Sequence, residues 1–156
     1  IIAEVQALVT PTVFPAPRRT ANGLDYNRIC MLIAILEKRL GLKFSQNDIY
    51  LNVVGGLKLS EPSVDLAVAL ALISSIKDIP VPHNVIAMGE LGLVGECRAI
   101  TDLQKRISES YRLGFDVIAI PQKSDKSRVK IPEGVSVIDI RSVYDALSLF
   151  KSSDNE

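Results

Sequence analysis

The sequence predicts one domain of the α/β or α+β class, with a mixed sheet and packed helices. Segments with apolar residues at helical spacing alternate with short apolar runs of strand length. Two of these runs flank a glycine-bearing turn at 91–95, which predicts a hairpin and therefore a sheet that is not wholly parallel. Of the 156 residues, 47% are hydrophobic, which is enough to bury a core.

The first half of the chain is expected to form two strands and two helices. A strand over 2–9 is followed by a loop over 10–23, whose prolines exclude regular helix. Apolar side chains at helical spacing predict a helix over 25–40 that ends at Gly41. A strand over 49–54 should end at the next glycine pair. The helix predicted over 62–75 is apolar on almost every side, so it should be buried.

The second half is expected to begin with the hairpin, formed by strands over 85–90 and 96–100. Thr101 is expected to cap a helix over 102–113, which Gly114 ends. Further strands are predicted over 117–120 and 135–140, then a last helix over 142–150 with a disordered tail at 151–156. Residues 1–150 are expected to form the single domain.

Composition restricts the functional class. The formal net charge is zero, so the chain is no polycation that binds nucleic acid or anionic membrane indiscriminately. Its two cysteines, Cys30 and Cys97, have no metal-ligand spacing and are too few for a disulfide framework, which favours a reducing cytoplasm. No apolar run reaches the roughly 18 residues that a membrane span needs. The start in strand-like sequence at Ile1 suggests a segment of a longer protein.

Ser63 is the most suggestive single residue for chemistry. It follows Pro62 at the start of the buried helix, where unpaired backbone amides could stabilise an anion. This position favours acyl transfer. However, Glu61 and Asp65 flank the hydroxyl, and no lysine or histidine stands at an obvious spacing. The pattern is typical of a hydrolase site that has lost its chemistry.

Several segments together resemble the C-terminal Lon-protease-like domain of the RadA (Sms) family of bacterial DNA-repair proteins, which are related to RecA. These segments are Glu4-Val5-Gln6-Ala7-Leu8-Val9, Leu36-Glu37-Lys38-Arg39, the run from Gly55 to Ala69 with Glu61-Pro62 and Asp65-Leu66-Ala67, Gly89-Glu90-Leu91-Gly92-Leu93-Val94-Gly95-Glu96, and Leu113-Gly114-Phe115.

The resemblance implies a ribosomal-protein-S5-like fold at the end of a larger ATPase that forms a hexameric ring and acts on DNA recombination intermediates. A zinc finger and a RecA-like ATPase would lie upstream, so ATP, magnesium and zinc are expected only there. This chain has neither a Cys-x-x-Cys pair nor a G-x-x-x-x-G-K-[ST] loop. Its only histidine, His83, has no second ligand at metal-binding spacing, so no cofactor or metal site is expected in this domain.

Lon proteases use a serine and lysine dyad, with the serine in a Gly-Pro-Ser-Ala-Gly setting. The resemblance places the serine at Ser63, but Glu61 and Asp65 replace the two glycines and Val64 replaces the alanine. The lysine position falls on Gln104, whose amide cannot accept a proton from serine. No catalytic residue is therefore expected, and Ser63 and Gln104 are interpreted as a degenerate dyad.

Other roles for these residues remain open. Lys105 follows Gln104, but one step along a helix turns a side chain by about 100°, so Lys105 should point away from whatever Gln104 faces. A peptidase that uses Ser63 with Lys105 or Lys58 is nevertheless the alternative. Ser63 can also be a helix-start residue that bonds local backbone, and Asp65 can pair with an arginine across a subunit boundary.

Basic residues form the candidate nucleic-acid surface, and these are Arg18, Arg19, Lys123, Lys126, Arg128 and Lys130. The last four lie in one loop with a single acid, Asp125, and no aromatic residue, so base stacking on that loop is not indicated. A solvated loop is the other interpretation. In a ring, repeated patches would add avidity for phosphates. A module that recruits a recombinase or helicase is a third interpretation of the domain, which the sequence does not separate from the first.

Overall fold

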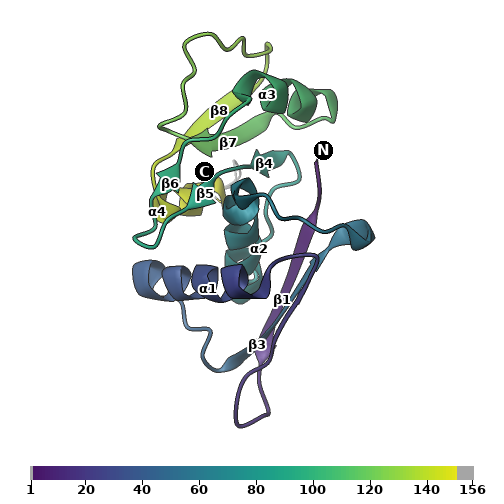
Figure 1. Ribbon diagram of the computed structural model, residues 1–156, viewed down its shortest axis with the longest axis vertical. Helices are drawn as coiled ribbons and strands as arrows, with labels where there is room; N and C mark the ends of the chain where they lie inside the picture. Colours follow the sequence, from purple (N-terminus) through teal and green to yellow (C-terminus); the bar gives the residue numbers. More distant parts are fainter. Residues whose placement is uncertain (1, 151–156) are drawn as a thin grey trace.

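Two small sheets lie at opposite ends of the computed structural model, which describes residues 2–150, with helix α2 between them (Figure 1). The strands of the first sheet are β1 (Val5–Pro11), β2 (Arg19–Asn22) and β3 (Asn47–Val53). The strand order is β1-β3-β2, with β1 antiparallel and β2 parallel to the central β3. The predicted mixed α/β class is therefore confirmed.

The second sheet is wholly parallel. It contains β4 (Val85–Ala87), β7 (Val117–Pro121) and β8 (Ser136–Ile140) in the order β4-β7-β8. Helix α3 (Leu103–Arg112) connects the hairpin to β7 and packs on this sheet through Ile107, which is fully buried with Ile118. Of these two sheets, only the first has both parallel and antiparallel neighbours, as the predicted mixed sheet requires.

The helices of the first half agree with their predicted ranges. Helix α1 (Tyr26–Leu40) begins after Asp25, whose carboxylate accepts a hydrogen bond from the Arg28 amide at 2.9 Å. It ends at Gly41, which is left-handed at φ 70° as a helix C-terminus often requires. Helix α2 (Asp65–Lys77) is preceded by a 3₁₀ turn, Pro62–Val64, and runs two residues beyond the predicted end. A second 3₁₀ turn, Val54–Gly56, follows β3.

Asp25→Ala is expected to lower the free energy of unfolding by about 1 kcal/mol, because the first turn of α1 would lose the acceptor for the Arg28 amide. Urea unfolding followed by circular dichroism measures this change. Asp25→Asn should retain most of the stability, since an amide oxygen caps equally well. Equal losses in both variants would show that charge, and not capping, is responsible.

Three local predictions are wrong. Residues 19–22, predicted within a loop, form strand β2. The predicted hairpin is shorter, because β5 (Glu90–Leu91) pairs with β6 (Cys97–Arg98) whereas β4 pairs in parallel with β7. Thr101 does not cap α3; Asp102 stands at that position with φ 57°.

The last helix is confirmed in place. It consists of one α-turn, α4 (Val143–Ala146), and a 3₁₀ turn, Leu147–Phe150, and Ser142 caps it by accepting a hydrogen bond from the Tyr144 amide at 3.3 Å. The predicted tail at 151–156 lies outside the described residues.

One core joins the two helices to the first sheet. Inward-facing residues of β3 pack against α1 and α2, and the core also reaches the last helix. Its largest fully buried side chains are Phe44, Leu32, Leu36, Ile49, Leu51, Leu66, Leu72 and Ile73. Burial of α2 on several sides, as its apolar sequence predicts, fixes the 3₁₀ turn that carries Ser63.

Candidate functional site

The Ser63 hydroxyl is held by two neighbours. Ser63 is 9% exposed and lies in the 3₁₀ turn before α2. Its hydroxyl donates a hydrogen bond to Glu61 Oε1 at 2.7 Å, and Arg106 Nη1 of α3 donates to Ser63 Oγ at 3.4 Å. Arg106 Nη2 also forms an ion pair with Glu61. Ser63, Glu61 and Arg106 thus form a closed cluster, called the Ser63 cluster below.

The Ser63 cluster contains no group suited to remove a proton from serine. The Arg106 hydrogen bond, followed by that of Ser63, lowers the pKa of the Glu61 carboxyl, which makes it a weaker base. Arginine remains protonated in proteins, so its guanidinium can only donate. The cluster can orient the hydroxyl but cannot activate it as a lysine dyad would.

Backbone amides around Ser63 are also engaged. The Val64 amide donates to Glu61 O at 3.2 Å, the Leu66 amide to Gly89 O at 3.0 Å and the Gly89 amide to Ser63 O at 2.8 Å. An oxyanion site needs amides that point at the developing charge. These three amides already have acceptors, so they do not offer that stabilisation in this conformation.

Gln104 lies away from Ser63. Its Nε2 donates to Lys130 O and to Ser108 Oγ, both at 3.1 Å, and its Oε1 accepts from the Lys130 amide at 2.7 Å. In this structure the position that the comparison aligns with the dyad lysine therefore bonds to Lys130 and Ser108, and not to Ser63. Arg106, two residues further along α3, takes that place, and the sequence comparison missed it.

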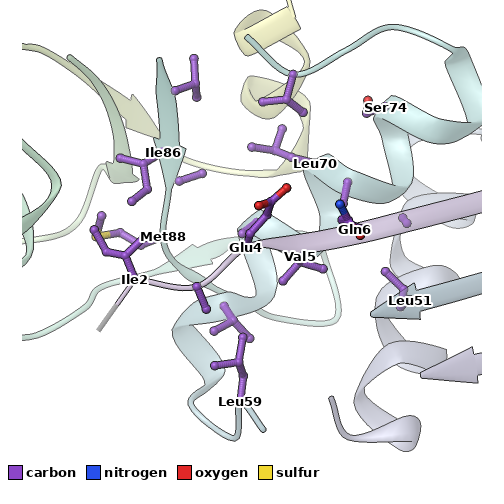
Figure 2. A pocket seen from close by; sticks show the side chains of 18 of the residues that line it. Ile2, Glu4, Val5, Gln6, Leu51, Leu59, Leu70, Ser74, Ile86 and Met88 are labelled. Carbon is purple, nitrogen blue, oxygen red and sulfur yellow. The ribbon is translucent and has the colours of Figure 1, made fainter. Parts of the chain in front are cut away.

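A large cavity of about 1740 Å³ lies beside the Ser63 cluster. Figure 2 shows Ile86 and Met88 near Ile2, and Leu70 and Ser74 on helix α2. Ser63 lines this cavity together with Lys58 and Lys105, the two lysines considered as alternative bases. Gln104 does not line this cavity, whereas Lys105 does. Among the described residues, the hydrogen-bond partners of Ser63 Oγ are Glu61 and Arg106.

Asp65 is fully buried and paired within the chain. Its Oδ1 accepts from Arg28 Nε at 2.9 Å, its Oδ2 pairs with Arg28 Nη2 and accepts from the Leu91 amide at 2.9 Å. Arg28 Nη2 also lies 3.6 Å from Glu90 Oε2. The hydrogen bond with Asp65 raises the pKa of Arg28. Asp65 therefore joins α1, α2 and β5, and does not need the partner across a subunit boundary that its sequence position suggested.

The basic candidates fall into two groups. Arg19 is committed to the fold, because its guanidinium donates to the carbonyls of Phe44 and Asn47, and Arg18 stacks over the Phe14 ring at 4.0 Å. Lys126 pairs with Asp139 at 2.5 Å. The side chains of Lys123, Arg128 and Lys130 are exposed in the loop between β7 and β8. We call these three residues the basic loop cluster.

The described residues show neither a metal-ligand cluster nor a reactive thiol at Cys97. Among residues 2–150, no group of three or more His, Cys, Asp or Glu side chains is placed to hold a metal ion. Burial, followed by the charges of Asp65 and Asp145, raises the pKa of Cys97 to about 12, so its thiol is unreactive at neutral pH. Each helix in this part of the chain is too short or too polar to cross a bilayer.

Comparison with known proteins connects this geometry to a family. A family model described as subunit ChlI of Mg-chelatase matches residues 28–124, which include Ser63, Asp65, Gln104 and Arg106. DNA repair protein RadA of Streptococcus pyogenes serotype M1 is 46% identical over 148 residues, or 95% of this chain and 32% of the relative. RadA of Streptococcus pneumoniae (strain ATCC BAA-255 / R6) is 46% identical over 94% of this chain and 35% of the relative.

RadA of Bacillus subtilis (strain 168) is 43% identical over 94% of this chain and 32% of the relative. The chain thus spans about a third of the length of these curated relatives. The resemblance to RadA that the sequence motifs indicate is confirmed. Because the matched model covers most of its length, the chain belongs to the family described as subunit ChlI of Mg-chelatase, in the form found in RadA proteins.

Proposed function

We propose that this chain is a non-catalytic Lon-like domain of a RadA-type DNA repair protein, that it supports assembly of a hexameric ring, and that it offers a basic loop to DNA. The Ser63 cluster carries the first part of the proposal. A guanidinium and an ionised carboxylate occupy the two positions next to the hydroxyl, where a neutral lysine would have to lie.

The energetic cost supports this proposal. The Glu61 carboxylate accepts directly from Ser63, so an alkoxide at that oxygen would face a negative charge. Two unit charges about 4 Å apart repel by about 4 kcal/mol at an effective dielectric near 20, and solvent around the half-exposed Glu61 reduces this, so the value is an upper limit. A barrier increase of that size would slow a reaction by at most roughly 10³-fold. Arg106 offsets part of this repulsion, but it cannot accept the proton.

The DNA contact is supported by the basic loop cluster and by the names of the relatives, which are DNA repair proteins. Exposed lysine and arginine side chains bind phosphates and release counterions, which gives affinity without sequence preference. In a ring every subunit would present the same cluster, and the sum of weak contacts would hold a recombination intermediate. We place this activity in the cytoplasm, with ATP, magnesium and zinc bound elsewhere in the whole protein.

Peptide hydrolysis is expected to be absent in the chain and in Ser63→Ala, because no base serves Ser63. The measurement is casein and fluorogenic-peptide cleavage at matched concentrations. Arg106→Lys is the informative third variant, since it places an ammonium that can lose its proton beside the hydroxyl. Gln104→Lys should stay silent, because that side chain faces Lys130.

The rival function is a peptidase that uses Ser63 with Lys58 or Lys105, and it is favoured by the cavity that all three residues line. Cleavage by the chain that disappears in Ser63→Ala would establish this rival. Ring assembly is tested separately by sedimentation across a hundredfold range of concentration. A chain that stays monomeric throughout would contradict the assembly role and would favour a module that recruits a recombinase or helicase.

A further inference from the structure

The basic loop cluster lies on a segment without regular structure. Residues 122–135 connect β7 to β8 and contain neither helix nor strand. Such a segment holds its charged side chains in a defined arrangement only if the rest of the fold anchors its backbone. The anchors therefore decide whether the charges can act together.

Three anchors lie in the first part of this loop. The buried Ser124 hydroxyl accepts from the Ile100 amide at 3.2 Å, Lys126 pairs with Asp139, and Val129 packs against the core of the second sheet. None of these three contacts involves the backbone of Lys130, the exposed residue that follows Val129.

Gln104 supplies that contact. Its amide oxygen accepts from the Lys130 N–H at 2.7 Å, and its amide nitrogen donates to the Lys130 carbonyl at 3.1 Å. One side chain thus satisfies both backbone groups of one residue, as a neighbouring strand would. A further bond from Gln104 Nε2 to Ser108 Oγ, at 3.1 Å on the same helix face, orients the amide.

We propose that Gln104 is a positioning residue for nucleic-acid binding: by pairing with the Lys130 backbone it holds Arg128 and Lys130 at the surface beside α3. This inference rests on the proposed function, because it names what aligns the charges that contact DNA. Ordering the backbone in advance removes part of the entropy cost that a mobile loop would meet on binding phosphate. Gln104, which stands where Lon proteases have the dyad lysine, would thus have a positioning role in place of a catalytic one.

Hydrogen exchange tests the pairing without DNA. In Gln104→Ala the Lys130 amide should exchange about fivefold to tenfold faster, because its acceptor is gone. Ser108→Ala is the matched control, since it removes only the hydroxyl and retains both bonds to Lys130. Exchange at Lys130 that is unchanged in Gln104→Ala would overturn the pairing.

DNA affinity tests the consequence. For a labelled oligonucleotide at about 0.1 M salt, Gln104→Ala should weaken binding fivefold to tenfold and lower the salt slope by about one, the effect of one phosphate contact. The variant removes no charge, so a change in salt slope reports misplaced cations and not a general loss of attraction.

A double-mutant comparison separates positioning from other effects. In a background of Arg128→Met and Lys130→Met, Gln104→Ala should change the affinity less than twofold, because no charge remains to be positioned. An equal loss in both backgrounds would overturn the proposal. A chain that binds no DNA at low salt would instead refute the proposed function, whereas binding that is equally strong with and without the Gln104 side chain would refute only its role.

Discussion

Replacement of Arg28 by methionine is expected to lower the free energy of unfolding by about 3–5 kcal/mol, because it leaves the buried Asp65 carboxylate without its charged partner. The Leu91 amide alone would remain to solvate that carboxylate. The midpoint of thermal unfolding should fall by roughly 6–20 °C in a domain of this size. Urea unfolding and calorimetry measure the two quantities.

Two further variants test the cause of this loss. In Arg28→Met with Asp65→Asn, the amide oxygen can still accept from Leu91 and no charge is buried, so at least half of the stability should return. Arg98→Met removes a cation that is 55% exposed and lies 3.7 Å from Glu90, and should cost less than about 1 kcal/mol. A double variant no more stable than the single one would show that Arg28 acts through packing.

Replacement of Lys123, Arg128 and Lys130 together by methionine is expected to weaken DNA binding about 10²–10³-fold at 0.1 M salt. Three phosphate contacts correspond to a slope of about 2.7 in log affinity against log salt concentration, and this slope should be lost. The side chains are exposed, so folding should change little. Fluorescence anisotropy over a salt series measures both quantities.

A matched control changes the net charge equally at another place. Lys38, Lys43 and Lys77 lie in the first half of the chain, and their replacement by methionine removes the same three charges. Affinity should then fall far less than in the loop variant. Similar losses in both triple variants would contradict a local binding surface and would indicate attraction by overall charge alone.

Local sequence signals predicted the helices well. Helix α1 has an acceptor at Asp25, apolar side chains at helical spacing and a glycine after its last turn, so its limits follow from short-range rules. Helix α2 was equally clear, because no surface helix is apolar on nearly every side. These features depend on residues within one or two turns of each other.

Strand β2 escaped prediction because it depends on a distant partner. Its four residues, Arg19–Asn22, show no apolar alternation and follow a segment rich in proline. They become a strand only because β3 offers its free edge, with Arg19 paired to Ile49. The same pairing fixes the Arg19 guanidinium on the carbonyls of Phe44 and Asn47, which removes it from the accessible cations.

The Ser63 cluster was predicted in part. Glu61 and Ser63 are neighbours in the sequence, but Arg106 comes from another helix whose rotation no motif gives. Asp102 precedes the first turn of that helix with a left-handed backbone conformation. The direction in which the helix begins determines which of its side chains face Ser63. One feature of the sequence does point to Arg106. The Glu61 carboxylate needs a cationic partner, and Arg106 lies two residues after Gln104, the position of the dyad lysine.

The position of β3 at the centre of the first sheet has a consequence for how the chain is made. As synthesis proceeds, β1 and β2 appear first, and neither pairs with the other in the finished sheet. Both must wait until residues 47–53 leave the ribosome, by which time α1 is complete. We therefore expect a nascent chain in which residues 47–53 have not yet been made to be cleaved readily by proteases. Once β3 has left the ribosome, the first sheet should form in one cooperative step.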